Sequence, residues 1–370
     1  MTRPRVVVAG LGDTGLLTAS HLSRDLDVVG ISCKPGLVSG QELGVRLTRP
    51  DEWAREYWLP FERFRRLDAV RTVHGALTGL DVASRTVQVT EASGSPREEP
   101  YDVLVIATGV TNGFWRRPVL QSPEEVDAAL LSDHERLRAA NSVVVIGGGA
   151  ASVSTAANVA GTWPSKRVDL YFPGERGLPH HHPRVWSRVR GRLADLGVGM
   201  HPRHRAVVPP GFDCDRIASG AVEWSTGQAP ACADAVVWAI GRVRPNTDWV
   251  PSELLDERGF VTVRSDLQSP VAPGVFAVGD VAATDPLRTS ARNRADKMLA
   301  RNIRAHLASR PLSHYRPPHG RWGSVLGVQP DGLTVFTASG FPFRIPSWAI
   351  DSILWPLLVR RGIYRGVRSS

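Results

Sequence analysis

Two glycine-rich turns carry the residue types and spacing that point most directly to chemistry in this sequence. Residues 10–15 read GLGDTG and residues 147–152 read GGGAAS. Both follow the pattern GxGxxG, with a serine in the third place of the second turn: Gly10, Gly12 and Gly15, then Gly147, Gly149 and Ser152. In such a turn the glycines let the backbone approach a pyrophosphate, and the following helix points free N–H groups at the phosphates. Two such turns predict two bound dinucleotides.

Each turn lies between a strand pattern and a helix pattern, which is the context that this motif needs. The first turn follows the apolar run RVVVA and precedes LLTASHLSRD, whose apolar residues recur with helical spacing, and then the strand DVVGIS. The second follows SVVVI and precedes the helix SVSTAANVAG and the strand RVDLYF. The chain therefore contains two βαβ units, which are its only internal repeat.

The predicted fold class is α/β, with two Rossmann-like dinucleotide-binding domains and a small C-terminal element. The buried-strand patterns YDVLVIATG and GVFAVGD belong with the first unit although they are far apart in the sequence. We therefore expect the first domain to comprise residues 1–115 and 246–315, with residues 116–245 forming the second domain between them. Residues 316–370 change in character and form the C-terminal element, a candidate for membrane or dimer contact.

Charge and targeting features limit the possible partners. The formal net charge of +9 arises from 42 Arg and three Lys against 36 acidic residues. No basic stripe is interleaved with aromatic residues, so nucleic acid is not expected; a solvated basic surface and attraction to anionic lipid or cofactors remain as alternatives. The N-terminus runs directly into a strand, and no run of 18 apolar residues occurs. We expect a cytoplasmic protein, at most peripheral on the inner face of the cell membrane.

The cysteine and histidine patterns exclude two kinds of site. Cys33, Cys214 and Cys232 form neither a CxxC nor a CxxxxC pair, so redox chemistry requires a bound cofactor. The run His180–His182 cannot readily converge on one ion, because three consecutive side chains diverge on an extended or helical backbone. We predict no metal site and interpret this run as a loop over the nicotinamide pocket.

The acidic residue that usually binds the ribose is missing from both units. Its expected place falls on Ser32 or Cys33 in the first unit and on Phe172 or Pro173 in the second. The hydroxyl group of Ser32 could partly substitute for the missing carboxylate in the first unit. In the second unit, Arg176 or Arg184 could favour NADPH, or both could be solvated loop arginines. Asp13 is unexpected, because a carboxylate in the first turn opposes an anionic ligand unless it faces away.

In these motifs the chain resembles the two-dinucleotide flavoproteins of the pyridine nucleotide-disulfide oxidoreductase superfamily. The resemblance is to the branch of type II NADH:quinone dehydrogenases and ferroptosis suppressors (apoptosis-inducing-factor homologues), and it covers nearly the whole length. The motifs that carry it are VVVAGLGDTG, YDVLVIATG, VVVIGGGAAS, AVVWAIGRVRPN and GVFAVGDVA.

The resemblance implies FAD on the first unit and NADH or NADPH on the second. Asp280 of the GD motif is expected to bind the ribityl chain, and the following helix is expected to point its N-terminus at the flavin. The cofactor-binding residues implied in this way are Gly10, Gly12, Thr14, Gly15, Ser32, Ala107, Thr108, Gly109, Gly147, Gly149, Ala150, Ala151, Ser152, Gly241, Gly279, Asp280, Thr289 and Ser290.

The catalytic residues are unknown from the sequence, and the candidates are Ser154 and Arg292. Ser154 stands where the family commonly has a glutamate beside the nicotinamide and flavin, and Arg292 lies in a segment that replaces a glutamine-rich helix on the quinone side. The departure at Ser154 puts the usual proton-handling role in doubt.

The expected activity is FAD-dependent transfer of electrons from NAD(P)H to a small-molecule acceptor. Quinone is favoured by the C-terminal element, where aromatic and aliphatic residues precede arginines: Trp348, Ile350, Ile353, Leu354, Trp355, Leu357 and Leu358, then Arg360, Arg361, Arg365 and Arg368. This tail could instead pack on its own protein or on the mate in a homodimer. Two alternative functions remain: a reductase of a protein acceptor such as ferredoxin, and a slow-turnover flavoprotein that signals by binding NAD(P)H.

Overall fold

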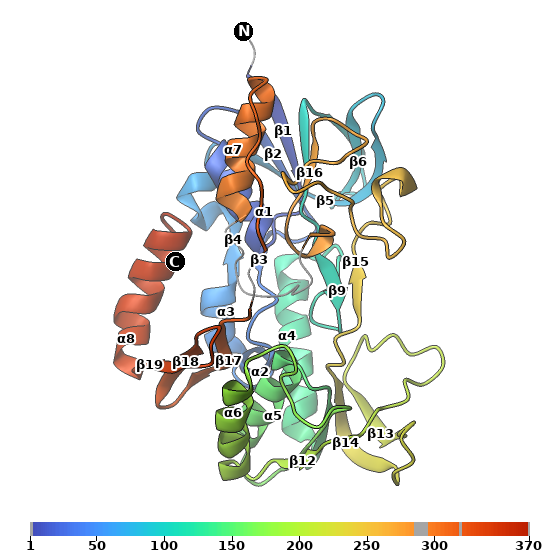
Figure 1. The fold of residues 1–370 in the computed structure, drawn as a ribbon, viewed down its shortest axis with the longest axis vertical. Helices are drawn as coiled ribbons and strands as arrows, with labels where there is room; N and C mark the ends of the chain where they lie inside the picture. The colour runs from blue at the N-terminus through green and yellow to red at the C-terminus, as the bar shows by residue number, and fades with distance from the viewer. Residues whose placement is uncertain (1–2, 285–294, 318–319, 369–370) are drawn as a thin grey trace.

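The computed structural model describes residues 3–284, 295–317 and 320–368. It contains two sheets of mainly parallel strands, one in the upper half of the molecule and one in the lower half (Figure 1). Helices pack on these sheets, so the chain has the predicted α/β fold built from two Rossmann-like units.

The first sheet has seven strands, of which the first five in spatial order run parallel. Their order is β16 (Val275–Ala277), β8 (Val103–Ile106), β1 (Arg5–Ala9), β2 (Asp27–Ser32), β5 (Val70–Asp81), β6 (Thr86–Glu91) and β7 (Pro96–Pro100). β16 thus lies beside β8 although they are about 170 residues apart, as the strand patterns predict. The central residues of β1, β2 and β8 are apolar or glycine and are buried, as expected for strands covered on both faces of the sheet.

Two helices from opposite ends of the sequence cover this first sheet together. α1 (Asp13–Leu22) packs against α7 (Ala295–Leu307), and both contribute to one apolar core. The smaller elements α2 (Leu43–Thr48), α3 (Pro50–Tyr57), β3 (Gly36–Val38), β4 (Trp58–Pro60), η1 (Phe61–Arg63) and η2 (Arg65–Leu67) fill the segment between β2 and β5.

The second sheet has five strands, and only β13 is antiparallel to its neighbour. Its order is β12 (Gly199–His201), β11 (Arg167–Tyr171), β10 (Ser142–Ile146), β14 (Ala231–Trp238) and β13 (Ala218–Val222). The helices of this half are α4 (Pro123–Ala139), α5 (Ala150–Thr162) and α6 (Pro183–Asp195). Ser122 is the N-cap of α4, in a capping box with Glu125.

The chain crosses between the two sheets along paired strands. β9 (Val110–Asn112) leads away from the first sheet, and β15 (Val243–Pro245) leads back to it, paired antiparallel with β9. Beyond β15 the chain passes through the short helix η3 (Ser252–Leu254) to β16 and η4 (Gly279–Val281). Residues 260–280 contain one strand, β16, and Val261 makes isolated bridges to Leu255 and Ala282.

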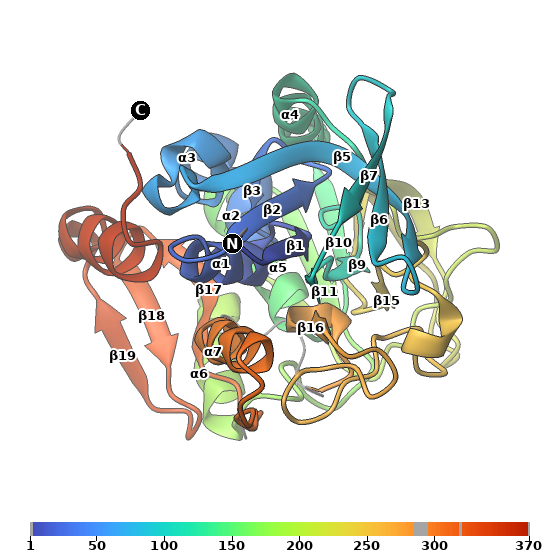
Figure 2. The ribbon, with the colours of Figure 1, turned by 90° about the horizontal axis from the view of Figure 1, so that it is seen from above.

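The C-terminal element lies on the side of the molecule away from β6 and β7 (Figure 2). It consists of β17 (Gly323–Gln329), β18 (Gly332–Phe336), β19 (Pro342–Ile345), α8 (Ser347–Ala349) and the π-helix η5 (Ile350–Ile363). Val325 and Phe336 join the apolar core of the second half, whereas Ile350 and Trp355 join that of the first. The element therefore packs against both halves.

Candidate functional site

A large cavity runs between the two sheets. Its volume is 1590 Å³, which exceeds the usual range for a pocket that holds one small molecule. The carboxyl ends of parallel strands face it from both halves: β16, β8, β1 and β2 from the first sheet, and β10, β11, β12 and β14 from the second. The turns that follow these strands hold most of the residues that the sequence predicts to bind cofactors.

The first and second glycines of each turn differ in what surrounds them. A Cβ on Gly10 would lie 2.6 Å from the carbonyl oxygen of Ala107, and one on Gly147 would collide with the carbonyl of Ala239. By contrast, a Cβ on Gly12 or Gly149 would meet no protein atom within 4 Å, although both glycines line the cavity. Protein packing therefore does not require glycine at positions 12 and 149. These positions leave room for a ligand that approaches the backbone closely, as a pyrophosphate does.

The third place of each turn is packed inside the protein. A Cβ on Gly15 would collide with the carbonyl of Gly10, and the Ser152 hydroxyl donates to the carbonyl oxygen of Gly149 at 2.9 Å. Gly12 and Gly149 are the N-caps of α1 and α5, and neither cap is made by a side chain. The first N–H groups of both helices, in the turns that line the cavity, therefore suit an anion.

Asp13 lies in the first turn of α1 and lines the same cavity. The Ser39 hydroxyl donates to Asp13 Oδ2 at 3.2 Å. Thr14 lies close to Gly279, whose Cβ would stand 3.4 Å from the Thr14 hydroxyl oxygen. The structure thus brings the first turn and the GD motif together.

The end of β2 presents a hydroxyl, a thiol and an amine to the cavity. Ser32 Oγ accepts the backbone N–H of Lys34 at 3.1 Å, and the Lys34 ammonium donates to the side chain of Gln121. Burial raises the pKa of the Cys33 thiol and lowers the pKa of Lys34. Cys33 is therefore a poor nucleophile at neutral pH.

The Ala107–Gly109 turn is joined to the return crossing by hydrogen bonds. The Thr108 hydroxyl donates to the carbonyl oxygen of Asn246 at 2.8 Å, and the Asn246 amide donates back to the carbonyl of Thr108 at 3.0 Å. Ala107, Thr108, Gly109 and Gly241 all line the cavity. The sequence does not indicate that Asn246 joins the two connecting segments by hydrogen bonds.

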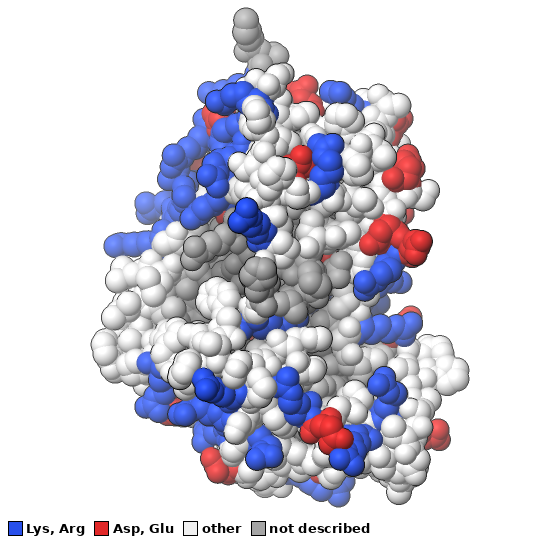
Figure 3. Space-filling model, viewed as in Figure 1, with Lys and Arg blue, Asp and Glu red and all other residues white. Residues whose placement is uncertain are grey.

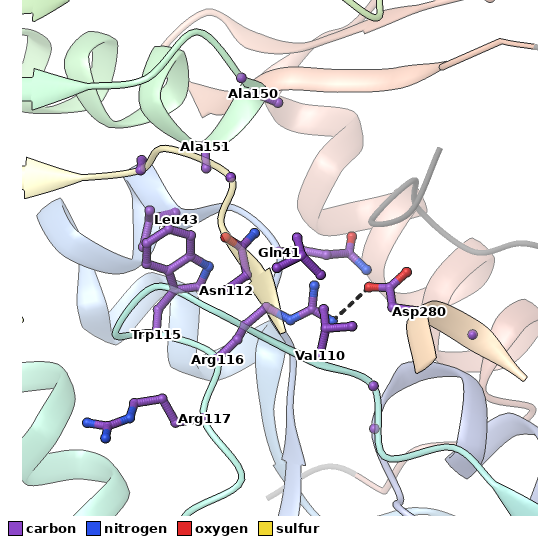
Figure 4. Close-up of a pocket in the computed structure, with 18 of the residues that line it drawn as sticks. Gln41, Leu43, Val110, Asn112, Trp115, Arg116, Arg117, Ala150, Ala151 and Asp280 are labelled. Carbon is purple, nitrogen blue, oxygen red and sulfur yellow. Dashed lines mark hydrogen bonds and ion pairs between the residues drawn. The ribbon is translucent and has the colours of Figure 1, made fainter. Parts of the chain in front are cut away.

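Asp280 forms an ion pair that the sequence does not indicate. Arg116 Nη2 lies 3.1 Å from Asp280 Oδ2, whereas the neighbouring Arg117 points away from this pair (Figure 4). Both partners are about one-fifth exposed at their side chains, at 24% and 19%. In the sequence, the only sign of this ion pair is the dipeptide Arg116–Arg117, which follows the strand pattern YDVLVIATG.

Ser154 faces the cavity from the first turns of α5, together with Ala150 and Ala151. It is buried, and its carbonyl and hydroxyl oxygens both accept from the side-chain amide of Asn158. The start of α2 faces it: Gln41, Glu42 and Leu43 line the cavity beside it. Sequence reasoning missed Glu42.

The histidine run borders the cavity through its first two members. His180 and His181 line it, and the His182 ring accepts the backbone N–H of Arg184 as the N-cap of α6. Burial, with Arg321 adding to it, lowers the pKa of His181 to about 4. Among the side chains that the structure describes, no group of three His, Cys, Asp or Glu residues could hold a metal ion.

The two candidate arginines of the second unit have different surroundings. Arg176 lines the cavity and donates to the carbonyls of Pro179 and His181, at 3.1 and 3.2 Å. Arg184 stacks over the ring of Phe341 instead, outside the cavity lining. A third arginine, Arg205, lines the cavity from the segment after β12. Three further candidates, Thr289, Ser290 and Arg292, lie outside the described residues.

Comparison with known proteins gives the family context of this cavity. A family model described as pyridine nucleotide-disulphide oxidoreductase matches residues 4–302. Oxidoreductase ptaL from Pestalotiopsis fici is 26% identical over 95% of this chain and 90% of its own length. The type II NADH:quinone oxidoreductase Ndh from Mycobacterium tuberculosis is 26% identical over 83% of this chain and 73% of its own length.

Solved structures share the fold at lower identity. A NAD-dependent persulfide reductase from A. fulgidus superposes with a TM-score of 0.64 at 21% identity over 90% of this chain; this chain spans 63% of that protein. A ferredoxin reductase from Rhodopseudomonas palustris superposes with a TM-score of 0.64 at 20% identity, over 92% of this chain and 88% of its own length.

Proposed function

The chain belongs to the pyridine nucleotide-disulphide oxidoreductase family, and on that premise we propose that it passes electrons from NAD(P)H through FAD to a quinone. The cofactors of this family are FAD and NADH or NADPH, and its members are oxidoreductases. The observation that carries the proposal is that two glycine turns, from separate βαβ units, open onto one cavity.

FAD is assigned to the first unit because its residues fit that group. Gly12 leaves space beside the N-terminus of α1, and Ser32 offers a hydroxyl at the end of β2. The assigned residues are Gly10, Gly12, Thr14, Gly15, Ser32, Ala107, Thr108, Gly109, Gly279 and Asp280. When bound, FAD supplies the step that accepts a hydride from the nicotinamide and yields its electrons to the acceptor.

The nicotinamide cofactor is assigned to the second unit, on Gly147, Gly149, Ala150, Ala151, Ser152 and Gly241. Arg205 and Arg176 favour NADPH, because both face the cavity near the end of β11, where an acidic residue would repel a 2′-phosphate. Glu175 is the nearby carboxylate, and it is engaged by Arg203, with Nε 2.7 Å from Oε1. Holding both dinucleotides in one cavity makes their encounter intramolecular.

Quinone is proposed as the acceptor on two grounds. One is the similarity to the mycobacterial NADH:quinone oxidoreductase, and the other is the exposed apolar surface of η5 and α8. Trp348 is 67% exposed, and the exposed face of η5 comprises Ile353, Leu357 and Leu358. No helix within residues 3–284, 295–317 and 320–368 combines the length and the apolarity needed to cross a membrane.

Only part of the apolar and basic residues of the C-terminal tail is available for contact with a membrane. Ile350 and Trp355 are buried in the protein core, and Arg360 and Arg368 pair with Glu56 and Asp68. The tail therefore packs on its own protein through one face and leaves the other face for a lipid surface. Contact with a second copy of the chain is the alternative use of that face.

A protein acceptor such as a ferredoxin is the second candidate. The fold is shared with a ferredoxin reductase, and Lys and Arg side chains gather at the upper left of the molecule, to the left of α7 (Figure 1 and Figure 3). Such a surface would attract an acidic partner.

Stopped-flow spectroscopy of the purified, FAD-loaded protein tests the proposal. We expect NADPH to bleach the flavin absorption rapidly and a soluble quinone to restore it. Recovery only with an iron-sulfur protein would support the ferredoxin alternative. No bleaching with either nicotinamide would contradict the oxidoreductase proposal and leave the signalling alternative.

A further inference from the structure

Glu42 lines the cavity and carries a carboxyl group that neither dinucleotide assignment uses. It lies between Gln41 and Leu43 at the start of α2 and is partly buried. Its backbone has φ 55° and ψ 49°, a left-handed conformation that is uncommon for residues other than glycine. Its carbonyl accepts the N–H of Arg46 at 2.9 Å, so the strained residue begins the helix. Strain of this kind is concentrated at functional sites.

Three parts of the chain meet at Glu42. α2 packs so closely on α5 that a Cβ on Gly44 would collide with the carbonyl of Ser154. From the C-terminal element, Gly327 of β17 faces the carboxyl group, and a Cβ there would collide with Glu42 Oε2. Asn158 links the other two parts, because its amide donates to the carbonyls of Ser154 and Leu326, at 2.9 and 2.8 Å. The carboxyl group is therefore held at the junction of both units and the C-terminal element.

The elements around Glu42 offer it little charge compensation. α5 and β17 contain no ionisable side chain. Arg46 donates to the carbonyl of Trp115 at 3.0 Å, and Arg49 is paired with Glu52 and donates to the carbonyl of Val328. Burial raises the pKa of Glu42 to about 7, against a smaller opposing effect of Arg49. A carboxyl group in this condition can both hold and release a proton near neutral pH.

The proposed reaction consumes a proton that neither substrate brings. NAD(P)H gives up a hydride, which is two electrons and one proton, whereas reduction of a quinone to the hydroquinone takes up two electrons and two protons. One proton per turnover therefore enters from solvent. Ser154, a sequence candidate for catalysis, has only a hydroxyl group engaged by Asn158 and no readily released proton.

We propose that Glu42 is the proton-transfer residue of the cavity, which passes a proton from solvent to the quinone oxygen as the quinone is reduced. This inference rests on the proposed function. Its carboxyl group loses the proton to the acceptor and regains one from solvent in each turnover, so atoms and charge balance.

The test compares two acceptors in the FAD-loaded wild type and in Glu42→Gln, which keeps the shape of the side chain. Ferricyanide accepts electrons without protons, so its reduction by NAD(P)H should be unchanged in the variant. Reduction of a soluble quinone should fall about 100-fold or more. The wild-type quinone rate should decline as the pH rises above about 7, and this decline should be absent in Glu42→Gln.

Infrared titration of the loaded protein supplies a measurement that does not depend on activity. We expect a protonated-carboxyl band that disappears with a midpoint near pH 7 in the wild type and is missing in Glu42→Gln. Asp133→Asn is the matched control, because burial raises the pKa of Asp133 to about 6 and this residue is not among those that line the cavity. The control should keep both the Glu42 band and the quinone rate.

Equal loss with both acceptors, or no loss with either, would overturn the assignment of Glu42. So would an infrared titration that Glu42→Gln leaves unchanged. A wild type that reduces ferricyanide but no quinone would instead refute the proposed function, and with it the inference, so the two failures are distinguishable.

Discussion

The guanidinium of Arg116 reaches across from the end of β9 to the carboxylate of Asp280, with Nη2 and Oδ2 3.1 Å apart. These residues are 164 positions apart in the sequence, and the pair lies on the wall of the cavity assigned to FAD. An acidic residue in the GD motif is thus compensated within the protein, which limits its repulsion of an anionic cofactor.

Removing this partner should destabilise the flavin-free protein. We expect Arg116→Ala to lower the free energy of unfolding by about 1–2 kcal/mol, since a partly buried carboxylate loses its guanidinium partner. Arg117→Ala is the control; its ion pair with Asp215 is exposed and long at 3.8 Å, so its effect should stay within about 0.5 kcal/mol. Urea denaturation of both variants measures the difference. Equal losses of unfolding free energy would contradict a stabilising role of the Arg116–Asp280 ion pair.

Alanine at the two open glycines should separate the two cofactors. Gly12→Ala and Gly149→Ala place a methyl group where no protein atom lies within 4 Å, so both variants should fold, and the poorer N-cap should lower the melting temperature by only a few degrees. We expect Gly12→Ala to lose most of its bound flavin, and Gly149→Ala to retain flavin but bind NAD(P)H at least tenfold more weakly. Each variant is the control for the other. Normal flavin content in Gly12→Ala would show that FAD is assigned to the wrong turn.

Arg205 should contribute to the choice between NADPH and NADH. Truncation in Arg205→Ala removes a charged donor that faces the cavity, so the dissociation constant for NADPH should rise about tenfold while that for NADH stays unchanged. Arg184→Ala should change neither, because Arg184 stacks on Phe341 outside the cavity lining. Calorimetric titration of both variants decides the matter, and equal weakening for both cofactors would exclude a 2′-phosphate contact.

Membrane contact is better tested by point variants than by truncation. Deleting the C-terminal residues would remove Ile350 and Trp355 from the core, so the fold itself would suffer. Leu358→Glu alters a side chain that is 55% exposed, and we expect about a tenfold loss of binding to anionic vesicles. Val271→Glu, at a valine that is 60% exposed elsewhere on the surface, is the control. Unchanged co-sedimentation of Leu358→Glu with vesicles would refute this use of η5.

The raised pKa of Glu42 also predicts how stability depends on pH. Below its ordinary value of 4.5 the carboxyl group is protonated in both the folded and the unfolded chain, and no cost arises. As the pH rises to about 7 the unfolded chain ionises more readily, so the folded state loses relative stability over that window. The loss is at most about 3 kcal/mol and should be absent in Glu42→Gln. If the unfolding free energies of the wild type and Glu42→Gln change in parallel from pH 4.5 to 8, the raised pKa of Glu42 is contradicted.

The features that the sequence predicts depend on neighbouring residues, whereas the features that it misses depend on contacts between residues far apart in the chain. The two turns and their flanking elements follow from local patterns, so Gly12, Gly149 and the N-cap Ser122 could be identified from spacing and residue type. β7, with the charged sequence PREEP, lacks the apolar alternation of a strand, because it lies at the edge of the sheet.

The remainder of the site depends on contacts between distant segments. Glu42 is a charged residue in an ordinary loop sequence, and only the fold brings Gly327 against it. In the same way, the amphipathic tail pattern could not show which of its apolar residues enter the core, because that depends on the neighbouring helices.

The paired crossings β9 and β15 have a mechanical consequence. Two antiparallel connections, clasped by Thr108 and Asn246, resist bending more strongly than a single linker would. This backbone pairing therefore restrains the angle between the two Rossmann halves.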